Sequence, residues 1–440
     1  MIAALRTSWV LFFGIGLMML GNGLQGTLLG VRAVLEGFDT AVTGVMMSGY
    51  FAGFFLGSTL VPRLLGRVGH VRIFSALAAL ASSAILMHAV LVEPAFWTVV
   101  RVLTGFSYAG MYIVAESWLN QGTDNANRGA VLSTYMIVLQ GSMAGGQFLL
   151  GAGDPTGTVL FMAVSVLVSL SVVPMLISTG PMPKFELIER LPVRRVIKAS
   201  PLAAVGTFLN GVALATVMSI GPVYAVAIGL SVGQVAVFMG VMNVGVILLQ
   251  YPIGKLSDRY DRRTVLMAVA FAAAVAAGLG ALAGGEAYWL VLVIAGVFGG
   301  LCVPIYSLCS AHLNDNLDSR HMVSASATMQ LIYGAGSVIG PSLAAAAMGA
   351  FGSSLFYWLI AAVNAGIGGF ALYRMTRRPS KPLGEQGSYV APYPRASAVA
   401  QTSMVETSMA DTERVEEETA QAAAEDAVAE AAEDGEQAQP

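Results

Sequence analysis

Charged residues are scarce in this sequence. Of its 440 residues only 11% are charged and 56% are hydrophobic, and the mean hydropathy is +0.71. A water-soluble protein of this length needs far more charged side chains to cover its surface. The composition therefore excludes an ordinary soluble protein and predicts that most of the outer surface contacts the lipid bilayer.

Cysteine and histidine are also rare, with two and four residues respectively. Cys302 and Cys309 lie two helical turns apart, too far for a disulfide, and we interpret them as small apolar side chains. The sequence has no His-Glu-x-x-His motif and no pair of membrane-embedded aspartates, and His88 stands alone in its apolar run. We therefore predict no catalytic residue, no metal and no cofactor, and an intramembrane enzyme is the weaker alternative.

Long apolar runs are abundant, and a run of 18 or more residues predicts a membrane-spanning helix. The first run continues through Leu28 and Leu29 without a clear cleavage site, so we interpret it as a span and not as a signal peptide. The spans fall into two groups of six, so we expect an all-α membrane protein with bundles at 1–179 and 201–378, joined by a connection at 180–200. The twelve predicted spans are 8–30, 41–61, 71–92, 94–119, 129–151, 157–178, 201–228, 233–253, 264–284, 287–309, 322–348 and 354–374.

Basic residues occur in alternate loops, which predicts the orientation of the chain. With the N-terminus inside, every even-numbered loop carries arginine or lysine, whereas the opposite loops hold essentially Arg32 alone. The positive-inside rule then places both termini in the cytoplasm and predicts a multi-pass protein of the inner (plasma) membrane. Residues 379–440 hold 13 of the 26 acidic residues and few large apolar ones, so we expect a disordered acidic tail.

The two groups of spans resemble each other in sequence. The loop after the second span contains Arg67, Gly69 and Arg72, and the loop after the eighth begins at Gly254 and runs Asp258-Arg259-Tyr-Asp-Arg262-Arg263. Arg67 and Arg259 are 259 − 67 = 192 residues apart. Such a parallel repeat of six spans is typical of secondary transporters with two pseudo-symmetric halves.

The second of these loops resembles the signature of the major facilitator superfamily, Gly-x-Leu-x-Asp-Arg-x-Gly-Arg-Arg, with Asp261 at the second glycine. The first loop is a degenerate copy, because Pro62 replaces glycine and Gly66 replaces aspartate. Arg101-x-x-x-Gly105 also resembles the family's pattern in the fourth span. The segments Ala115–Asn120, Arg128-Gly129 and Gly340-Pro341 are similar to a bacterial branch whose substrates are largely unassigned. The resemblance implies a twelve-helix transporter that works by alternating access, with proton coupling left open.

Polar side chains at membrane depth are candidates for binding the transported solute. Arg101, Gly105, Tyr108, Tyr112 and Glu116 share one face of the fourth span. In the resembling family this span lines the central cavity, so we expect Arg101 to bind an anionic group or to hold a carboxylate, although snorkelling to the interface is the alternative. Weaker cavity candidates that follow from the resemblance are Asn22, Gln25, Asn210, Tyr224 and Tyr306.

Glu116 is the only acidic residue within a span of the first group. It is the candidate for proton coupling, and a structural pair with Arg128 is the alternative. The first span has no aspartate where many drug/proton antiporters of the family carry one, which weakens a prediction of drug export. We expect the amides and the tyrosine that remain at membrane depth to lie between the halves: Gln140, Gln147, Asn243, Gln250, Gln330 and Tyr333.

The family resemblance also implies a conformational switch in the cytoplasmic loops. Asp258 is expected to meet the start of the fifth span near Arg128 and to latch the cytoplasmic side. Gly66 has lost the matching carboxylate in the first loop, so this latch is one-sided. The expected partners are the bilayer, a small-molecule substrate and, with coupling, protons; no nucleic acid is expected, and the chain is expected to be a monomer. A receptor or scaffold that does not transport is the alternative on the same fold.

Overall fold

The computed structural model describes the backbone of residues 2–121, 125–177, 190–284, 287–377 and 386, and the side chains of these residues except 2–8, 120–121, 125–130 and 319. Long apolar segments become helices because a helix satisfies every backbone N–H and C=O group without water. The first bundle contains α1 Ile2–Leu35, α2 Thr40–Val68, α3 His70–Val90, α4 Pro94–Gln121, α5 Asn125–Phe148, η1 Leu149–Ala152, α6 Val159–Leu170 and α7 Val172–Ile177. The second contains α8 Val193–Ala199, α9 Pro201–Ala227, α10 Val232–Arg259, α11 Arg262–Ala283, α12 Tyr288–Asn314, α13 Ser319–Phe351 and α14 Leu355–Arg377.

These helices match the twelve predicted spans, with α6 and α7 forming one span that is interrupted at Ser171. Within the described residues, eleven stretches are long and apolar enough to cross a membrane. The remaining span is α5, whose hydropathy is lowered by Gln140 and Gln147, both buried. The predicted all-α membrane fold is confirmed, and the cytoplasmic location of the termini stays a prediction.

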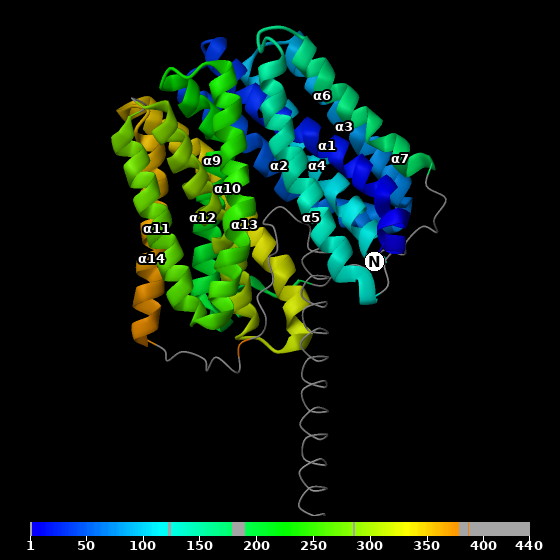
Figure 1. Ribbon diagram of the computed structural model, residues 1–440. Coiled ribbons are helices and arrows are strands. Elements are labelled where there is room, and N and C mark those ends of the chain that lie inside the picture. The colour runs from blue at the N-terminus through cyan, green and yellow to red at the C-terminus, as the bar shows by residue number, and fades with distance from the viewer. Residues whose placement is uncertain (1, 122–124, 178–189, 285–286, 378–385, 387–440) are drawn as a thin grey trace, which may run out of the picture.

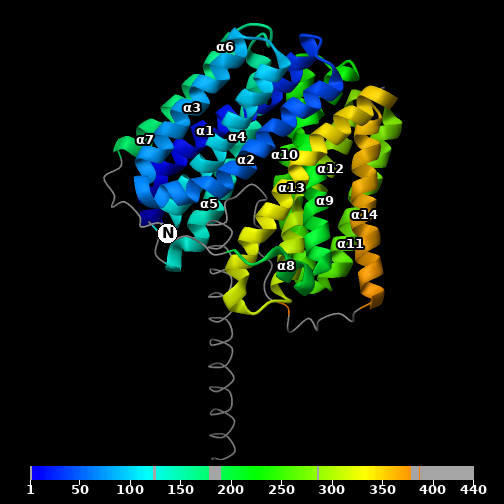
Figure 2. The ribbon, with the colours of Figure 1, turned by 180° about the vertical axis from the view of Figure 1, so that it is seen from behind.

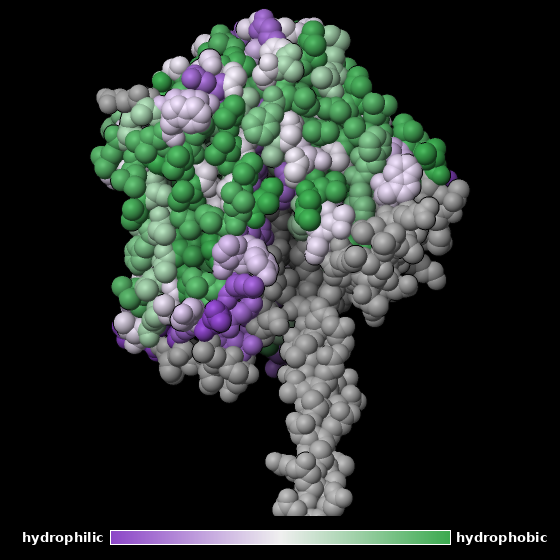
Figure 3. Space-filling model, in the orientation of Figure 1, coloured by the Kyte–Doolittle hydropathy of each residue, from purple (hydrophilic) through white to green (hydrophobic). Residues whose placement is uncertain are grey.

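The two bundles lie side by side (Figure 1; Figure 2, seen from behind). The turns after α2 and α10 and the end of α14 lie at one end of the molecule, which we call the basic end because it carries Arg67, Arg259 and Arg377. At the opposite end the bundles lie together, and they splay apart toward the basic end. Hydrophobic residues cover the flanks, while hydrophilic residues gather at the two ends and in the furrow between the bundles (Figure 3).

Within each bundle, glycines allow pairs of helices to touch backbone to backbone. A Cβ atom built on Gly53 of α2 would lie 1.9 Å from the Val102 carbonyl oxygen of α4, and one on Gly105 would lie 1.9 Å from the Tyr50 carbonyl oxygen. The second bundle repeats this crossing between α10 and α12, where a Cβ on Gly245 would lie 1.9 Å from the carbonyl oxygen of Gly296. Gly53 and Gly245 are 245 − 53 = 192 residues apart, the same offset as the repeat in the loops.

At the end opposite the basic end, the bundles meet through small residues of α2 and α13. We call this contact the seam, formed by Gly44, Ser48, Pro341, Ser342 and Ala345. The Ser48 and Ser342 hydroxyl oxygens lie 2.8 Å apart, and the Ser342 backbone N–H donates to Ser48 Oγ at 3.2 Å. A Cβ on Gly44 would lie 2.3 Å from the Ala345 Cβ and 2.9 Å from the Pro341 carbonyl oxygen. The contact therefore requires glycine at position 44.

The described part of the connection between the bundles touches both of them. The Arg190 guanidinium donates to the Ser58 carbonyl oxygen of α2 at 3.1 Å, while the Leu191 N–H donates to the Ser324 carbonyl oxygen of α13 at 3.1 Å. Burial next to Arg63 lowers the pKa of Arg190, with desolvation as the larger cause. The predicted acidic tail, 379–440, lies outside the described residues except for Gln386.

The seam yields a prediction about which side of the membrane reaches the interior. Gly44→Leu is expected to separate α2 from α13 at the seam and to favour closure at the basic end. The measurement is labelling of Ser219→Cys, a residue between the bundles, by a membrane-impermeant thiol reagent in right-side-out and inverted vesicles. Cys302 and Cys309 are both 0% exposed and should add little background.

We expect Gly44→Leu to shift labelling toward the side of the seam, relative to the variant with Ser219→Cys alone. The matched control is Gly66→Leu, because a Cβ on Gly66 has no neighbouring atom within 4 Å. Unchanged sidedness in Gly44→Leu would show that the seam does not hold that end closed.

Candidate functional site

A polar pocket lies between the bundles, in the half of the helices nearer the seam. We call it the central pocket. Four helices of the first bundle and α9 of the second contribute to its wall. Its lining residues are Asn22, Gly23, Gly26, Thr27, Tyr50, Phe51, Arg101, Met143, Gln147, Met218 and Ser219.

Arg101 brings a positive charge to this pocket from α4. Its side chain is buried, with 4% of the residue exposed, so it does not snorkel to the membrane surface. The guanidinium carbon lies 4.6 Å from the centre of the Tyr50 ring, a cation–π contact. The Tyr50 hydroxyl in turn lies 3.4 Å from both Nδ2 and Oδ1 of Asn22. Of the predicted cavity residues, Arg101 and Asn22 therefore meet in one site.

Gln147 and Asn243 connect the two bundles beside this pocket. The Asn243 Nδ2 group donates to Gln147 Oε1 at 2.8 Å and to its own helix at the Met239 carbonyl oxygen at 3.1 Å. Both residues are buried. The Gln147 oxygen of the first bundle thus accepts a hydrogen bond from the second bundle. The prediction that these two amides lie between the halves is confirmed.

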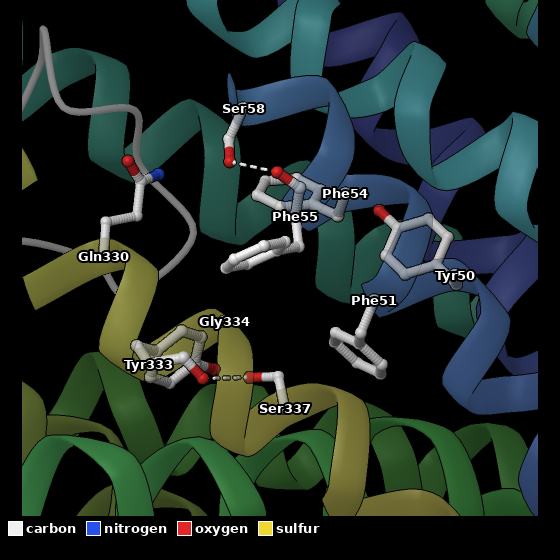
Figure 4. Close-up of a pocket in the computed structure, with 9 residues that line it drawn as sticks. All are labelled: Tyr50, Phe51, Phe54, Phe55, Ser58, Gln330, Tyr333, Gly334 and Ser337. Carbon is white, nitrogen blue, oxygen red and sulfur yellow. Dashed lines mark hydrogen bonds between the residues drawn. The ribbon is translucent and has the colours of Figure 1, made fainter. Parts of the chain in front are cut away.

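A second, aromatic pocket adjoins the central one and shares Tyr50 and Phe51 with it. It lies between α2 and α13. Figure 4 shows Phe55 of α2 pointing across the pocket toward Tyr333 of α13. Its lining residues are Tyr50, Phe51, Phe54, Phe55, Ser58, Gln330, Tyr333, Gly334 and Ser337. The predicted interface residues Gln330 and Tyr333 thus lie between the halves.

Tyr108 and Tyr112 of the predicted stripe on α4 pack against α2 rather than lining the central pocket. The Tyr108 and Tyr50 ring centres are 6.3 Å apart, and Tyr112 packs edge-on against Phe54 at 6.0 Å. The close crossing at Gly105 brings the α2 backbone against this face, so only Arg101, nearer the start of α4, lines the central pocket. The Tyr112 hydroxyl donates to the Met19 sulfur at 2.8 Å.

Glu116 lies at the basic end of α4, away from the central pocket. It is 1% exposed, and its carboxylate accepts a hydrogen bond from the Tyr135 hydroxyl of α5. Fifteen residues of helix separate it from Arg101, which is about 22 Å along the axis. The Arg128 side chain, its predicted structural partner, lies outside the described residues.

The other predicted cavity residues lie within the bundles and line neither of the two pockets. The Asn210 amide donates to the Cys302 carbonyl oxygen at 2.7 Å, which joins α9 to α12. Tyr224 stacks on Phe356 with ring centres 4.7 Å apart. Tyr306 packs edge-on against Tyr333 at 5.5 Å, and Gln25 is 1% exposed in α1.

The loop after α10 is held by three ion pairs at the basic end. Asp261 caps α11; burial acts to raise its pKa, but the hydrogen bonds from Arg263 and the positive charge nearby together lower it. Buried Arg262 pairs with Asp315 of α12 at 3.2 Å, and Asp258 lies 3.8 Å from the same guanidinium. Gly254 is buried within α10, while Arg259 is exposed.

The loop after α2 is built differently. Arg67 and Arg72 are exposed, and Gly69 has φ +91°, a left-handed conformation that favours glycine. The counterpart of Arg262 is His70, since 262 − 70 = 192, and its Nε2 lies 3.0 Å from the Ser117 hydroxyl oxygen. A His–Ser contact thus replaces the ion pair, a difference that the degenerate loop sequence only partly indicated.

Within the described residues, no group of three histidine, cysteine or acidic side chains could hold a metal ion. The expectation that the sequence carries no hydrolase-type motif was wrong, because Gly229-Leu-Ser231-Val-Gly233 has the Gly-x-Ser-x-Gly spacing of a hydrolase nucleophile. Ser231 caps the start of α10, and its hydroxyl oxygen accepts from the Gln234 backbone N–H. In return, the Ser231 backbone N–H donates to Gln234 Oε1. The reciprocal capping box explains the serine structurally.

Comparison with known proteins agrees with this architecture. The sequence model of the Major Facilitator Superfamily matches residues 203–410. An uncharacterized MFS-type transporter of Enterobacter sp. strain 638 is 27% identical over 81% of this chain and 93% of its own length. The uncharacterized MFS-type transporter YcaD of Escherichia coli O6:K15:H31 is 25% identical over 82% of this chain and 93% of its own length.

Solved structures show the same fold at low sequence identity. The nucleoside transporter NupG, in a variant form, superimposes with a TM-score of 0.71 at 13% identity, over 83% of this chain and 99% of that one. A D-xylose-proton symporter gives a TM-score of 0.66 at 12% identity, over 83% of this chain and 96% of that one. The predicted resemblance to the superfamily is confirmed.

The buried pair Arg262–Asp315 yields a prediction about stability. Arg262→Met leaves the Asp315 carboxylate buried without this partner, and we expect the free energy of unfolding to fall by about 3–5 kcal/mol. Thermal unfolding of the purified protein would measure this as a lower midpoint. The double variant Arg262→Met/Asp315→Leu should recover most of the loss, because it removes both charges.

The control is Arg320→Gln, which breaks an ion pair with Asp318 whose side chains are 78% and 69% exposed. Its effect should stay within about 1 kcal/mol. Equal midpoints for Arg262→Met and Arg320→Gln would contradict a structural role for the buried pair.

Proposed function

We propose that this chain, a multi-pass membrane transporter of the major facilitator type by its fold and its relatives, moves a small solute across the inner membrane by alternating access. The solute would bind in the central pocket, and the two bundles would close alternately at the seam and at the basic end. The known proteins that it resembles are transporters, which points away from an enzyme.

The observation that carries this proposal is the position of the central pocket. Both bundles contribute to its wall, with Arg101 and Tyr50 from the first and Ser219 from the second. It lies between an end held together by the seam and an end where the bundles splay apart. A solute bound there would contact both halves, so its binding energy could differ between the two arrangements and shift their populations.

The closure of the basic end would depend on Asp258. In the arrangement described here its side chain is 46% exposed and lies 3.8 Å from Arg262. When the bundles approach at this end, its carboxylate would meet the unpaired N–H groups at the start of α5, a favourable position for a negative charge. Such a contact is worth on the order of 1–2 kcal/mol, which changes a state population about tenfold.

Proton coupling is assigned to Glu116 in this scheme, because it is the buried carboxylate of the first bundle. Its position far from Arg101 means that coupling would act through the contact between α4 and α5 and not through direct contact with the solute. The working unit is a monomer with the bilayer, the solute and protons as partners.

Transport can be tested before the solute is identified. Proteoliposomes that contain the full chain are incubated with a small-metabolite extract, and mass spectrometry identifies solutes that accumulate in the lumen relative to empty liposomes. Counterflow of each accumulated solute then measures exchange. Arg101→Ala is expected to reduce exchange more than tenfold, because a charged hydrogen-bonding group is lost from the pocket, and Arg101→Lys should rescue it poorly.

Arg320→Gln serves as the control at equal protein content, since Arg320 is exposed at the basic end. A folded protein that accumulates no solute would argue for the receptor or scaffold alternative. Wild-type exchange by Arg101→Ala would remove Arg101 from the transport site.

A further inference from the structure

We propose that residues 190–192 form a strap that holds the two bundles apart at the basic end, and that Pro62 creates its anchor on the first bundle. This inference rests on the proposed alternating access and adds a device that favours one of the two arrangements. Its evidence is a carbonyl group that Pro62 leaves without its helical partner, the hydrogen bonds from the strap to both bundles, and the register in which α2 faces α13.

The anchor on the first bundle is a consequence of Pro62, which lies inside α2. Proline has no backbone N–H, so the carbonyl oxygen of Ser58, four residues earlier, lacks its usual partner within the helix. The Arg190 guanidinium donates to this oxygen at 3.1 Å. In the second bundle the repeat places Gly254 at the equivalent position, since 254 − 62 = 192, and glycine keeps its N–H for the helix. The proline that distinguishes the first loop therefore creates the acceptor for the strap.

The next residue of the strap is held by the second bundle. The Leu191 N–H donates to the Ser324 carbonyl oxygen of α13 at 3.1 Å, and the Thr328 hydroxyl donates to the Leu191 carbonyl oxygen at 2.6 Å. Leu191 is 6% exposed and belongs to the hydrophobic core. The helix that follows the strap, α8, also lies against α13 (Figure 2). Because both backbone groups of Leu191 are bonded to α13, the strap moves with the second bundle, and Arg190 joins it to the first.

The position of the strap conflicts with closure of the basic end. The helices α2 and α13 run antiparallel, and their contact at the seam pairs Ser48 with Ser342. Farther from the seam by 62 − 48 = 342 − 328 = 14 residues, close to four helical turns, the same register places Pro62 opposite Thr328. Thr328 is the residue that bonds Leu191, so α2 could pack on this part of α13 only after the strap has left. The strap therefore favours the arrangement in which the bundles splay apart at the basic end.

Spin-label distances across the basic end test the strap in full-length protein in lipid nanodiscs. Labels at Val68→Cys of α2 and Arg320→Cys of α13, whose native side chains are exposed, report the separation of the bundles. Arg190→Ala removes the hydrogen bond to Ser58 and is expected to raise the ratio of short to long distances about three- to tenfold. The matched control is Arg194→Ala, because Arg194 is exposed on α8 and carries the same charge. It should leave the ratio unchanged.

Two further variants test the contacts at the two ends of the strap. Pro62→Ala returns an N–H to the helix that can bond the Ser58 carbonyl oxygen, so it should shift the ratio in the same direction as Arg190→Ala. The double variant Arg190→Ala/Pro62→Ala should shift it no further than the larger single change, because both changes act on the same acceptor. Thr328→Val removes the hydroxyl that donates to Leu191 and should also favour the short distances.

An unchanged ratio in Arg190→Ala, an equal shift in Arg194→Ala, or additive shifts in the double variant would overturn the proposal. Two results separate it from the transport function. A ratio that responds to Asp258→Asn but not to Arg190→Ala would sustain alternating closure and refute the strap. A ratio that responds to Arg190→Ala in a protein that exchanges no solute would sustain the strap and refute transport.

Discussion

The close contact of glycine with backbone carbonyl groups sets the spacing of the helices in both bundles. In a membrane, lipid tails are as apolar as leucine, so helices associate mainly through tight packing and hydrogen bonds between them. Gly53 and Gly105 bring α2 against α4, Gly245 brings α10 against α12, and Gly211 and Gly336 bring α9 against α13. A Cβ atom built on Gly211 or Gly336 would lie only 2.3 or 2.0 Å from the facing carbonyl oxygen. Such close contacts within each bundle favour movement of the bundle as a unit.

This packing explains why a single charged side chain can define the central pocket. The crossing at Gly105 turns most of the polar face of α4 toward α2, which leaves Arg101 to reach the space between the bundles. The Arg101 guanidinium lies over the Tyr50 ring, and the Tyr50 hydroxyl contacts Asn22. The neighbouring Gln147 accepts a hydrogen bond from Asn243 of the other bundle. A ligand in this pocket therefore contacts groups whose positions depend on both bundles.

Much of the fold could be predicted from the sequence because its signals are chemical and repeated. The length of the apolar runs indicated the membrane spans, and the 192-residue offset between Arg67 and Arg259 indicated two related halves. Gln147 and Asn243 were predicted between the halves because buried amides need partners across helices. The comparisons then confirmed the resemblance to major facilitator transporters, while the sidedness of the membrane stays a prediction.

The site was less predictable. Helix periodicity shows which residues share one face of a helix, but it does not show which other helix packs against that face. Tyr108 and Tyr112 share the face of Arg101, yet they pack on α2, since glycine spacing alone does not indicate which helix approaches. The stacking of Tyr224 on Phe356 could not be predicted for a similar reason, because the partner ring lies 356 − 224 = 132 residues away in sequence. Glycines spaced four residues apart also differ in their surroundings: Gly336 and Gly340 lie at a close crossing, whereas a Cβ on Gly141 would meet nothing within 4 Å.

The central claim is that the two ends of the molecule close in alternation, and paired distance measurements test it most directly. Spin labels at Val90→Cys and Phe351→Cys, whose native residues are 85% and 77% exposed, report on the seam end. Labels at Gly66→Cys and Arg320→Cys, both exposed, report on the basic end. In full-length protein in lipid nanodiscs, Asp258→Asn should lengthen the distances at the basic end and shorten those at the seam end relative to wild type. Distances that change together at both ends, or that do not change at all, would contradict alternating closure through Asp258.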